Sequence, residues 1–216
     1  FVEIRIYGSS DVFLRRPISI NDVVPERREI HLLVRNAGAG TDALCRLKKE
    51  DVINMVLPLG NGFSIKSGIK RPLLIGGGVG AAPLLYLGKC LRDSGITPTF
   101  LLAAKTANDL LEVERFKCVG EVLLSTDDGS AGHPGLVTDN PVLGNEWDMF
   151  YCCGPMPMMK AIGGMALVRN IPCEVSLENV MACGLGACLC CVEDTVDGHV
   201  CVCTDGPVFD IRKLKW

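Results

Sequence analysis

The stretch "RPLLIGGGVGAAPLLYLGKCLRDSG" (residues 71–95) decides the fold that we expect for this chain. An apolar run leads into a group of glycines, and an amphipathic pattern follows and stops at Gly95. A short apolar run before glycines is typical of a buried strand, and the glycines predict a tight turn between that strand and a helix. Strand, turn and helix in this order form the unit from which parallel α/β sheets are built.

The same alternation continues toward the C-terminus. Residues 97–106, 118–128 and 146–155 are typical of buried strands, and residues 156–171 have the pattern of a helix. Strands that alternate with helices predict a parallel α/β domain over residues 69–172, with ligands at the carboxyl ends of the strands.

Residues 1–68 have a different character. Residues 1–8 and 28–38 alternate apolar with polar side chains, as half-buried strands do, and only residues 42–53 favour a short helix. We therefore expect a β-rich domain over residues 1–68 and a small third domain over residues 173–216. The expected fold class is multidomain, α/β plus β.

The composition limits what the chain can do. Of 216 residues, 48% are hydrophobic and 22% are charged, which suits a protein with a real core. The net charge of −3 implies no broad basic surface for nucleic acid. The sequence contains neither a long apolar run nor a signal segment, so we expect a cytoplasmic protein without a membrane partner.

Six of the twelve cysteines lie within residues 181–203, "MACGLGACLCCVEDTVDGHVCVC". In the cytosol such a group indicates metal or redox chemistry rather than disulfides. Cys183, Cys188 and Cys191 have the spacing C-x4-C-x2-C, which is the ligand order of a plant-type [2Fe–2S] cluster, and Cys203 would be the fourth ligand. The small residues between them would let backbone N–H groups point at the sulfur atoms.

Other uses of these cysteines stay open. A zinc site usually has two short C-x2-C pairs, and this segment has one. A Rieske centre needs two histidines, and only His199 lies nearby. Cys190 and Cys201 are spare thiols that could replace a ligand. Buried, unreactive side chains are expected for Cys45, Cys90, Cys118 and Cys173.

The glycine turn lies where a phosphate-binding turn would lie, between a strand and the start of a helix. From Gly78, however, it reads G-x-G-x-x-P, and the acidic residue of the ordinary dinucleotide pattern is absent. A tight structural turn therefore remains the alternative.

Four stretches together resemble a known family. "RRPISI" (15–20), "NAGAGT" (36–41), "IGGGVGAAPL" (75–84) and "YCCGPMPMM" (151–159) follow one another as in the ferredoxin–NADP reductase superfamily. That superfamily joins a flavin-binding β-barrel to a nicotinamide-binding α/β domain and often to a [2Fe–2S] domain. The ending "MACGLGACLCC…CVCTDGPVFD" further resembles the iron–sulfur electron-transfer subunits of NAD-dependent (type B) dihydroorotate dehydrogenases.

The resemblance implies two cofactor sites besides the cluster. FAD would bind the first domain at Arg16, Pro17, Ile18, Ser19, Leu33, Val34, Arg35, Gly40 and Thr41. NAD would bind the second domain at Gly77, Gly78, Gly80, Cys153, Gly154 and Pro155. Cys153 would pack where the nicotinamide meets the flavin and would not act as a nucleophile.

Two further expectations follow from the resemblance. Asp127 and Asp128 would favour NADH over NADPH by repelling a 2′-phosphate. In the family, more sequence stands before the segment that Phe1 begins, so we expect the first barrel strands to be missing and the flavin barrel to be incomplete.

The resemblance also implies a function. The chain would be an oxidoreductase subunit without catalytic side chains, which passes electrons to NAD⁺ through the [2Fe–2S] cluster and FAD. Its partner would be an FMN-containing subunit that oxidises dihydroorotate in de novo pyrimidine (UMP) biosynthesis, and two such pairs would form a heterotetramer. Two alternatives remain: the small subunit of an NAD(P)H–ferredoxin or sulfide oxidoreductase, and a non-enzymatic zinc-binding interaction module.

Overall fold

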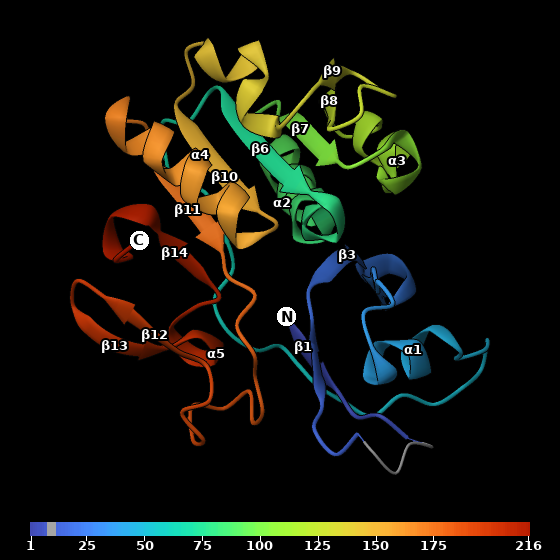
Figure 1. Cartoon of the computed structure of the whole chain (residues 1–216). Helices are drawn as coiled ribbons and strands as arrows, with labels where there is room; N and C mark the ends of the chain where they lie inside the picture. The colour runs from blue at the N-terminus through green and yellow to red at the C-terminus, as the bar shows by residue number, and fades with distance from the viewer. Residues whose placement is uncertain (8–11) are drawn as a thin grey trace.

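The chain forms three parts that meet near its N-terminus (Figure 1). The computed structural model describes residues 1–7 and 12–216. The first part consists mainly of strands, the second is an α/β sheet, and the third holds the clustered cysteines.

Two small antiparallel sheets and one helix make up the first part. One sheet has the order β2-β1-β5, and β3 and β4 form a separate hairpin. The bounds are β1 Val2–Ile4, β2 Arg16–Ile18, β3 Ile20–Val24, β4 Glu29–Leu32, α1 Ala39–Cys45 and β5 Met55–Val56.

Two predictions for the first part need correction. The predicted strand over residues 1–8 is a strand only at residues 2–4, and Gly8 lies outside the described residues. The predicted helix over residues 42–53 lies at residues 39–45 instead. It ends early because the backbone N–H of Lys48 donates to the carboxylate of Asp51 at 2.7 Å and Glu50 adopts a left-handed φ of 77°, which together form a turn.

A seven-stranded sheet with the order β14-β11-β10-β6-β7-β8-β9 forms the second part. All neighbours are parallel except β11 and β14, which are antiparallel. The bounds are β6 Pro72–Gly77, β7 Thr99–Ala104, β8 Glu121–Thr126, β9 His133–Pro134, β10 Met149–Cys153, β11 Cys173–Ser176 and β14 Val208–Asp210. The predicted parallel α/β sheet is confirmed.

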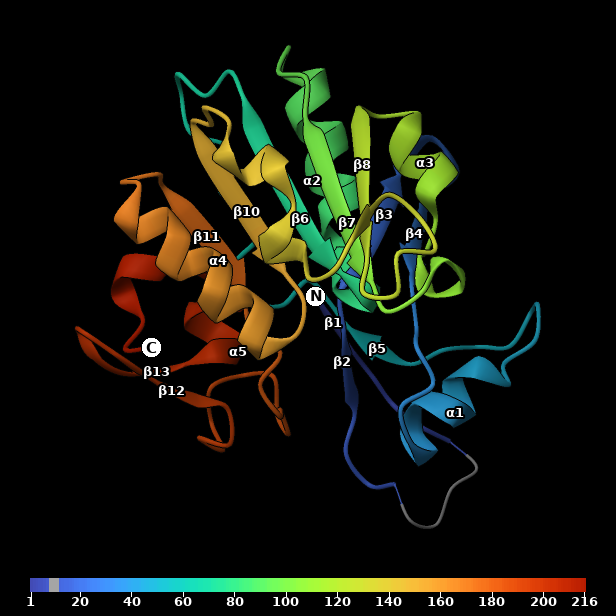
Figure 2. The same ribbon diagram turned by 45° about the horizontal axis from the view of Figure 1, so that its top comes forward.

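Helices cover both faces of this sheet (Figure 2). α4 (Met156–Val168) lies on one face, and α2 (Ala82–Asp93) and α3 (Val113–Lys117) lie on the other. Side chains alternate along a strand, so Leu73 and Ile75 of β6 join the core under α4, whereas Leu74 joins the core under α2. Burial on both faces explains the unbroken apolar runs of these strands. No helix in the described ranges has the length and apolar character needed to cross a membrane.

The third part contains a long loop, a hairpin and a short helix. The hairpin is β12 (Val192–Thr195) and β13 (Gly198–Cys201), and α5 (Val202–Asp205) follows it directly. β11 and β14 also come from residues 173–216, yet both belong to the central sheet. A domain boundary at residue 172 therefore separates strands of one sheet. The alternation of strands and helices along the chain does not show which distant strands pair in space.

The first and third parts contact each other directly. The side-chain amide of Asn61 donates to the carbonyl oxygens of Thr204 and Asp205 at 2.8 and 3.2 Å. The backbone N–H of Asn61 donates to the carbonyl oxygen of Gly206 at 2.6 Å. These bonds hold the strand-rich part beside the cysteine loop.

Candidate metal centre and cofactor sites

The β12–β13 hairpin brings the four predicted metal ligands together. Cys183, Cys188 and Cys191 lie on the loop before β12, and Cys203 lies in α5 after the hairpin has returned the chain. As a result, the backbone N–H of Cys203 lies 3.3 Å from the sulfur of Cys191. The hairpin thus accounts for the eleven residues between the third and fourth cysteine.

Backbone N–H groups of the loop point at the sulfur atoms. The N–H of Leu185 donates to Cys183 Sγ at 3.3 Å, and that of Gly186 donates to Cys203 Sγ at 3.2 Å. Gly184 and Gly186 have left-handed φ angles of 68° and 76°, which glycine adopts without strain. The loop therefore provides hydrogen bonds that stabilise negative charge on sulfur.

These contacts change the acidity of the thiols. Hydrogen bonds, first of all from Leu185 N–H, lower the pKa of Cys183 to about 6. Burial raises the pKa of Cys203 to about 12. Cys183 therefore loses its proton readily, while a metal must displace the proton of Cys203.

The cysteines approach one another in two pairs: hydrogen bonds of Cys188 are among the causes that lower the pKa of Cys183, and the backbone N–H of Cys203 lies 3.3 Å from the sulfur of Cys191. In the part of the chain that the structure describes, no group of three or more His, Cys, Asp or Glu side chains is arranged to hold a metal ion. A zinc site needs four ligands around one point, whereas a binuclear cluster takes its four thiolates in pairs. The paired thiols therefore suit a [2Fe–2S] cluster.

All twelve cysteines lie among the described residues, and each is a free thiol. Cys190 is exposed and Cys201 is half-buried beside the loop. Cys173 is buried, as predicted, and Cys90 is only half-buried. The expectation of buried side chains is wrong for Cys45 and Cys118, which are exposed. Both lie at helix ends that contribute little to the core, a position that residue type alone does not reveal.

The glycine turn lies where the strand order of the central sheet reverses. The chain runs outward from β6 through β7 to β8 on one side, and β10 lies on the other side. Because β6 and β10 are parallel, with Gly76 opposite Cys153, the turn after β6 meets residues 153–155 after β10. Ligands of open α/β sheets bind in the crevice at such a reversal.

Two of the three predicted NAD-binding glycines are required by packing. A Cβ on Gly80 would lie 2.6 Å from Cα of Gly154, and one on Gly77 would lie 2.8 Å from Cδ of Pro155. Gly78 differs, since it has a φ of 55° and no atom within 4 Å of a Cβ position. Close packing in the turn thus explains why positions 77 and 80 are glycine, whereas the space beside Gly78 is open to a ligand.

The other residues predicted at this site are placed as follows. The side chain of Cys153 is buried, and burial raises its pKa far above the usual value, so the thiol stays neutral. Asp127 and Asp128 follow β8 at the same edge of the sheet and are exposed. Their preference for NADH stays a prediction.

The structure brings two of the predicted FAD-binding segments together. The guanidinium group of Arg16 lies directly against Gly40, where any side chain would collide with it. The hydroxyl of Thr41 accepts the backbone N–H of Ala37 at 2.8 Å. Of the remaining predicted residues, Pro17, Ile18, Ser19, Leu33 and Val34 are half-buried, and Arg35 is exposed.

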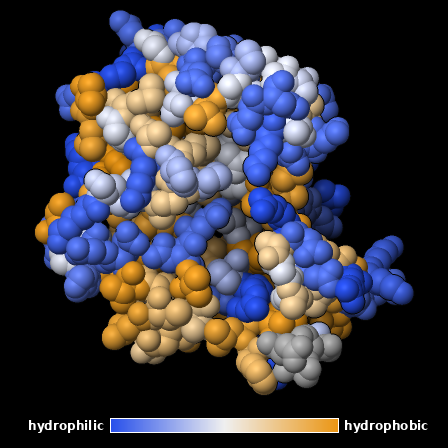
Figure 3. Space-filling view, in the orientation of Figure 1, coloured by the Kyte–Doolittle hydropathy of each residue, from blue (hydrophilic) through white to orange (hydrophobic). Residues whose placement is uncertain are grey.

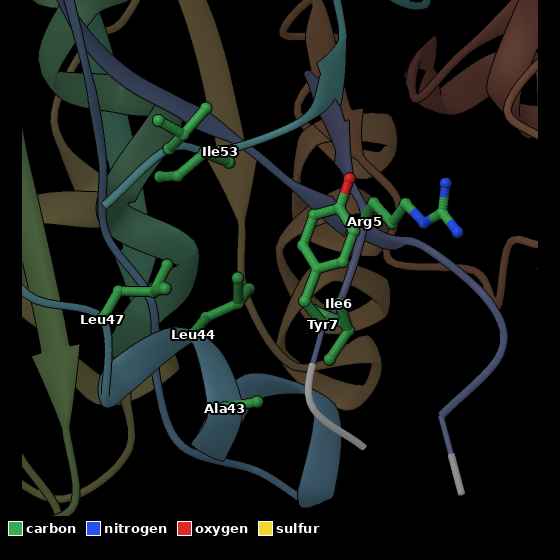
Figure 4. A pocket seen from close by; sticks show the side chains of 8 residues that line it. Arg5, Ile6, Tyr7, Ala43, Leu44, Leu47 and Ile53 are labelled. Carbon is green, nitrogen blue, oxygen red and sulfur yellow. The ribbon is translucent and has the colours of Figure 1, made fainter. Parts of the chain in front are cut away.

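A hollow lies between α1 and the residues that follow β1 (Figure 4). Apolar side chains such as Leu44, Leu47 and Ile53 line it, and Arg5 points away from them (Figure 4). None of the predicted cofactor residues lines this hollow.

No pattern in the sequence indicates a role for Glu3, an acidic residue buried in β1. It is 1% exposed, and neither carboxylate oxygen has a hydrogen-bond partner among the described residues. Burial raises the pKa of Glu3 to about 7, although Arg15 opposes this effect. A lone acidic residue in a short strand resembles any solvated side chain until its neighbours are known.

Comparison with known proteins relates these sites to a family. Residues 178–215 match the model of the iron–sulfur cluster binding domain of dihydroorotate dehydrogenase B. The dihydroorotate dehydrogenase B (NAD(+)) electron transfer subunit of Caldanaerobacter subterraneus is 43% identical over 203 residues, which are 91% of this chain and 79% of the relative. That of Clostridium acetobutylicum is 42% identical over 197 residues, 91% of this chain and 77% of the relative.

This chain belongs to that family. The predicted role as an electron-transfer subunit and the predicted class of oxidoreductase are thereby confirmed. The family model also supports the predicted iron–sulfur cluster.

A solved structure of an NADH-dependent reduced ferredoxin–NADP oxidoreductase is similar as well. Its matching chain has a TM-score of 0.89 and 32% identity, and the match covers 100% of this chain and 78% of that chain. An FAD/NAD-binding domain of a nitric oxide dioxygenase from Vibrio cholerae matches with a TM-score of 0.65 at 21% identity over 81% of each chain, which shows the fold alone. This chain therefore has the fold of FAD- and NAD-linked reductases, and these findings support the predicted FAD and NAD.

Proposed function

We propose that this chain carries electrons between an FMN-containing dihydroorotate dehydrogenase subunit and NAD⁺, in a heterotetramer of two such pairs. The observation that supports this most directly is the cysteine loop, whose two pairs of thiols receive backbone N–H groups. When bound, FAD exchanges electrons in pairs or singly and the [2Fe–2S] cluster exchanges them singly, so together they connect two-electron to one-electron chemistry.

The side chains of this chain bind and position these groups. Cys183, Cys188, Cys191 and Cys203 would hold the cluster. Arg16 would pair with the FAD pyrophosphate, because its guanidinium group is permanently charged and lies against Gly40 in the first turn of α1. Gly78 would let NAD approach the open turn after β6.

The metal centre can be tested on anaerobically purified protein. Iron, acid-labile sulfide and visible cluster absorption are expected in the wild type. Cys188→Ser should lose most of that absorption, because one iron loses a ligand, whereas the matched control Cys118→Ser should keep it. Zinc in place of iron, or full absorption in Cys188→Ser, would contradict the proposed ligand set.

An apolar surface surrounds the exposed ligand Cys188. Leu185 and Leu189 are both 64% exposed on the same loop. Figure 3 shows apolar side chains gathered along the lower edge of the molecule, where Figure 1 places this loop. Exposed apolar groups beside an electron carrier are typical of a protein interface, so we place the contact with the catalytic subunit here.

The interface can be tested by reconstitution with the catalytic subunit. Leu185→Asp combined with Leu189→Asp should weaken association at least tenfold, because the apolar contact would then bury charges. Leu136→Asp is a suitable control, since Leu136 is 60% exposed on a different element. Equal binding by both variants would place the interface elsewhere.

The similarity to the ferredoxin–NADP oxidoreductase chain supports one alternative, in which the electron partner is a ferredoxin-linked subunit. The two functions differ in the protein that exchanges electrons with this chain. A purified complex that contains FMN and reduces NAD⁺ with dihydroorotate supports the proposal, whereas a complex that responds only to ferredoxin supports the alternative.

A further inference from the structure

The carboxyl group of Glu3 is buried where the first and third parts meet, and among the described residues it has no hydrogen-bond partner. The nearby arginines are engaged elsewhere. Arg15 donates to the backbone oxygens of Glu3 and Asn54, and Arg16 donates to that of Leu14. A buried carboxylate without hydrogen bonds costs free energy, so its position requires an explanation.

Glu3 faces the cysteine loop. A Cβ on Gly184 would lie 2.9 Å from Cγ and 3.4 Å from Oε1 of Glu3, and Gly184 directly follows the ligand Cys183. On its own sheet, Glu3 is opposite Pro17 of β2, the strand that we propose to hold FAD. Figures 1 and 2 show β1 between the third part and α1. Glu3 therefore lies between two proposed cofactor sites.

We propose that the carboxylate of Glu3 lowers the reduction potential of the iron–sulfur cluster, an inference that rests on the proposed function. Its negative charge opposes the arrival of a further electron at the neighbouring loop, and this effect is strong where water is excluded. The N–H groups that point at the sulfur atoms have the opposite effect, because they stabilise negative charge. A low potential suits a carrier whose electrons finally reach NAD⁺.

The test is an EPR-monitored redox titration of the whole chain at about pH 8.5, where the carboxyl group is ionised. Glu3→Gln removes the charge and keeps the shape, so the midpoint potential should rise. We expect about a tenfold change in the reduced-to-oxidised ratio at a fixed potential, which is about 59 mV for one electron. Glu3→Asp keeps the charge and should stay near the wild type. Glu146→Gln, which removes an exposed carboxylate before β10, should leave the potential unchanged.

The outcomes separate this inference from the proposed function. EPR detects only molecules that hold the cluster, so partial loading of a variant does not hide its potential. An unchanged potential in Glu3→Gln, or an equal shift in Glu146→Gln, would overturn the role of Glu3 alone. Loss of the cluster from Glu3→Gln but not from Glu3→Asp would also overturn it, because Glu3 would then serve assembly. Absence of any iron–sulfur signal in the wild type would overturn the proposed function itself.

Discussion

Among the glycines of the turn, Gly80 has the least room. Its α-carbon faces the backbone of Gly154 on the neighbouring strand end, and a methyl group there would have to displace one of the two segments. Backbone cannot move aside as a flexible side chain can, so the turn and residues 153–155 depend on each other.

Gly80→Ala should lower the free energy of unfolding by about 1–3 kcal/mol, because the added carbon overpacks this contact. Chemical denaturation of the purified chain measures the change. Gly164→Ala in α4 is the matched control, since no atom lies within 4 Å of its Cβ position and alanine favours a helix. Equal stability of Gly80→Ala and the wild type would show that the turn can shift without cost.

The spare thiols offer a second test at the scale of single residues. Cys190 is exposed. The backbone N–H of Cys201, at the end of the hairpin, donates to the Asp205 carboxylate at 2.9 Å. Neither cysteine belongs to the two sulfur pairs, so Cys190→Ser and Cys201→Ser should each retain the iron content of the wild type. Loss of iron from either variant would revise the ligand assignment.

Ion pairs attach the hairpin of β3 and β4 to the helices α2 and α3, which cover one face of the central sheet. Asp22 of β3 accepts Lys89 of α2 at 2.6 Å and Arg115 of α3 at 2.7 Å, and its side chain is 2% exposed. Asn21 donates to the carbonyl oxygen of Ala82 at 3.1 Å. These contacts fix the strand-rich part against the face of the sheet that α2 and α3 cover.

Asp22→Asn should lower the free energy of unfolding by about 1–3 kcal/mol at neutral pH, because two cations lose their acceptor. Burial alone would raise the pKa of Asp22, but the hydrogen bond and charge of Lys89, with Arg115, outweigh it and lower the pKa. A lowered pKa stabilises the fold above the ordinary aspartate value, and this stability is lost as the pH falls through the folded-state value.

The difference between the wild type and Asp22→Asn should therefore shrink as the pH falls below about 4, and it should disappear once the pH is below the lowered folded-state pKa of Asp22. Denaturation curves over a series of pH values provide the measurement. Asp93→Asn, which removes an exposed ion pair with Arg92, should show no such dependence. A difference that persists in acid would assign the effect to packing instead of charge.

For the whole molecule, the cysteine loop and the central sheet depend on different interactions. The sheet is buried between α2 and α4. The loop joins this core through Met181 and Cys191 at its ends, while the residues between them are held by contacts to sulfur. Removal of iron by a chelator should therefore speed hydrogen exchange at residues 181–191 and leave the amides of β6, β7 and β10 protected. Exchange that rises equally in β6 would show that the metal centre supports the entire fold.

The sequence by itself determined the features that depend on neighbouring residues. The apolar runs predicted the buried strands, the glycines after residue 75 predicted the turn, and the cysteine spacing predicted a site with four thiolates. Each is a local pattern, since strand burial, turn geometry and ligand spacing are set within a few positions of the chain.

Only the tertiary structure decided which distant residues meet. It joined β11 and β14 to the central sheet, placed Gly80 on Gly154, and buried the carboxyl group of Glu3 beside the cysteine loop. Such contacts arise from the packing of segments far apart in the sequence, and the charge or size of one residue does not reveal its neighbour. The paired sulfur atoms show both contributions, because their spacing is local and their meeting requires the hairpin to return the chain.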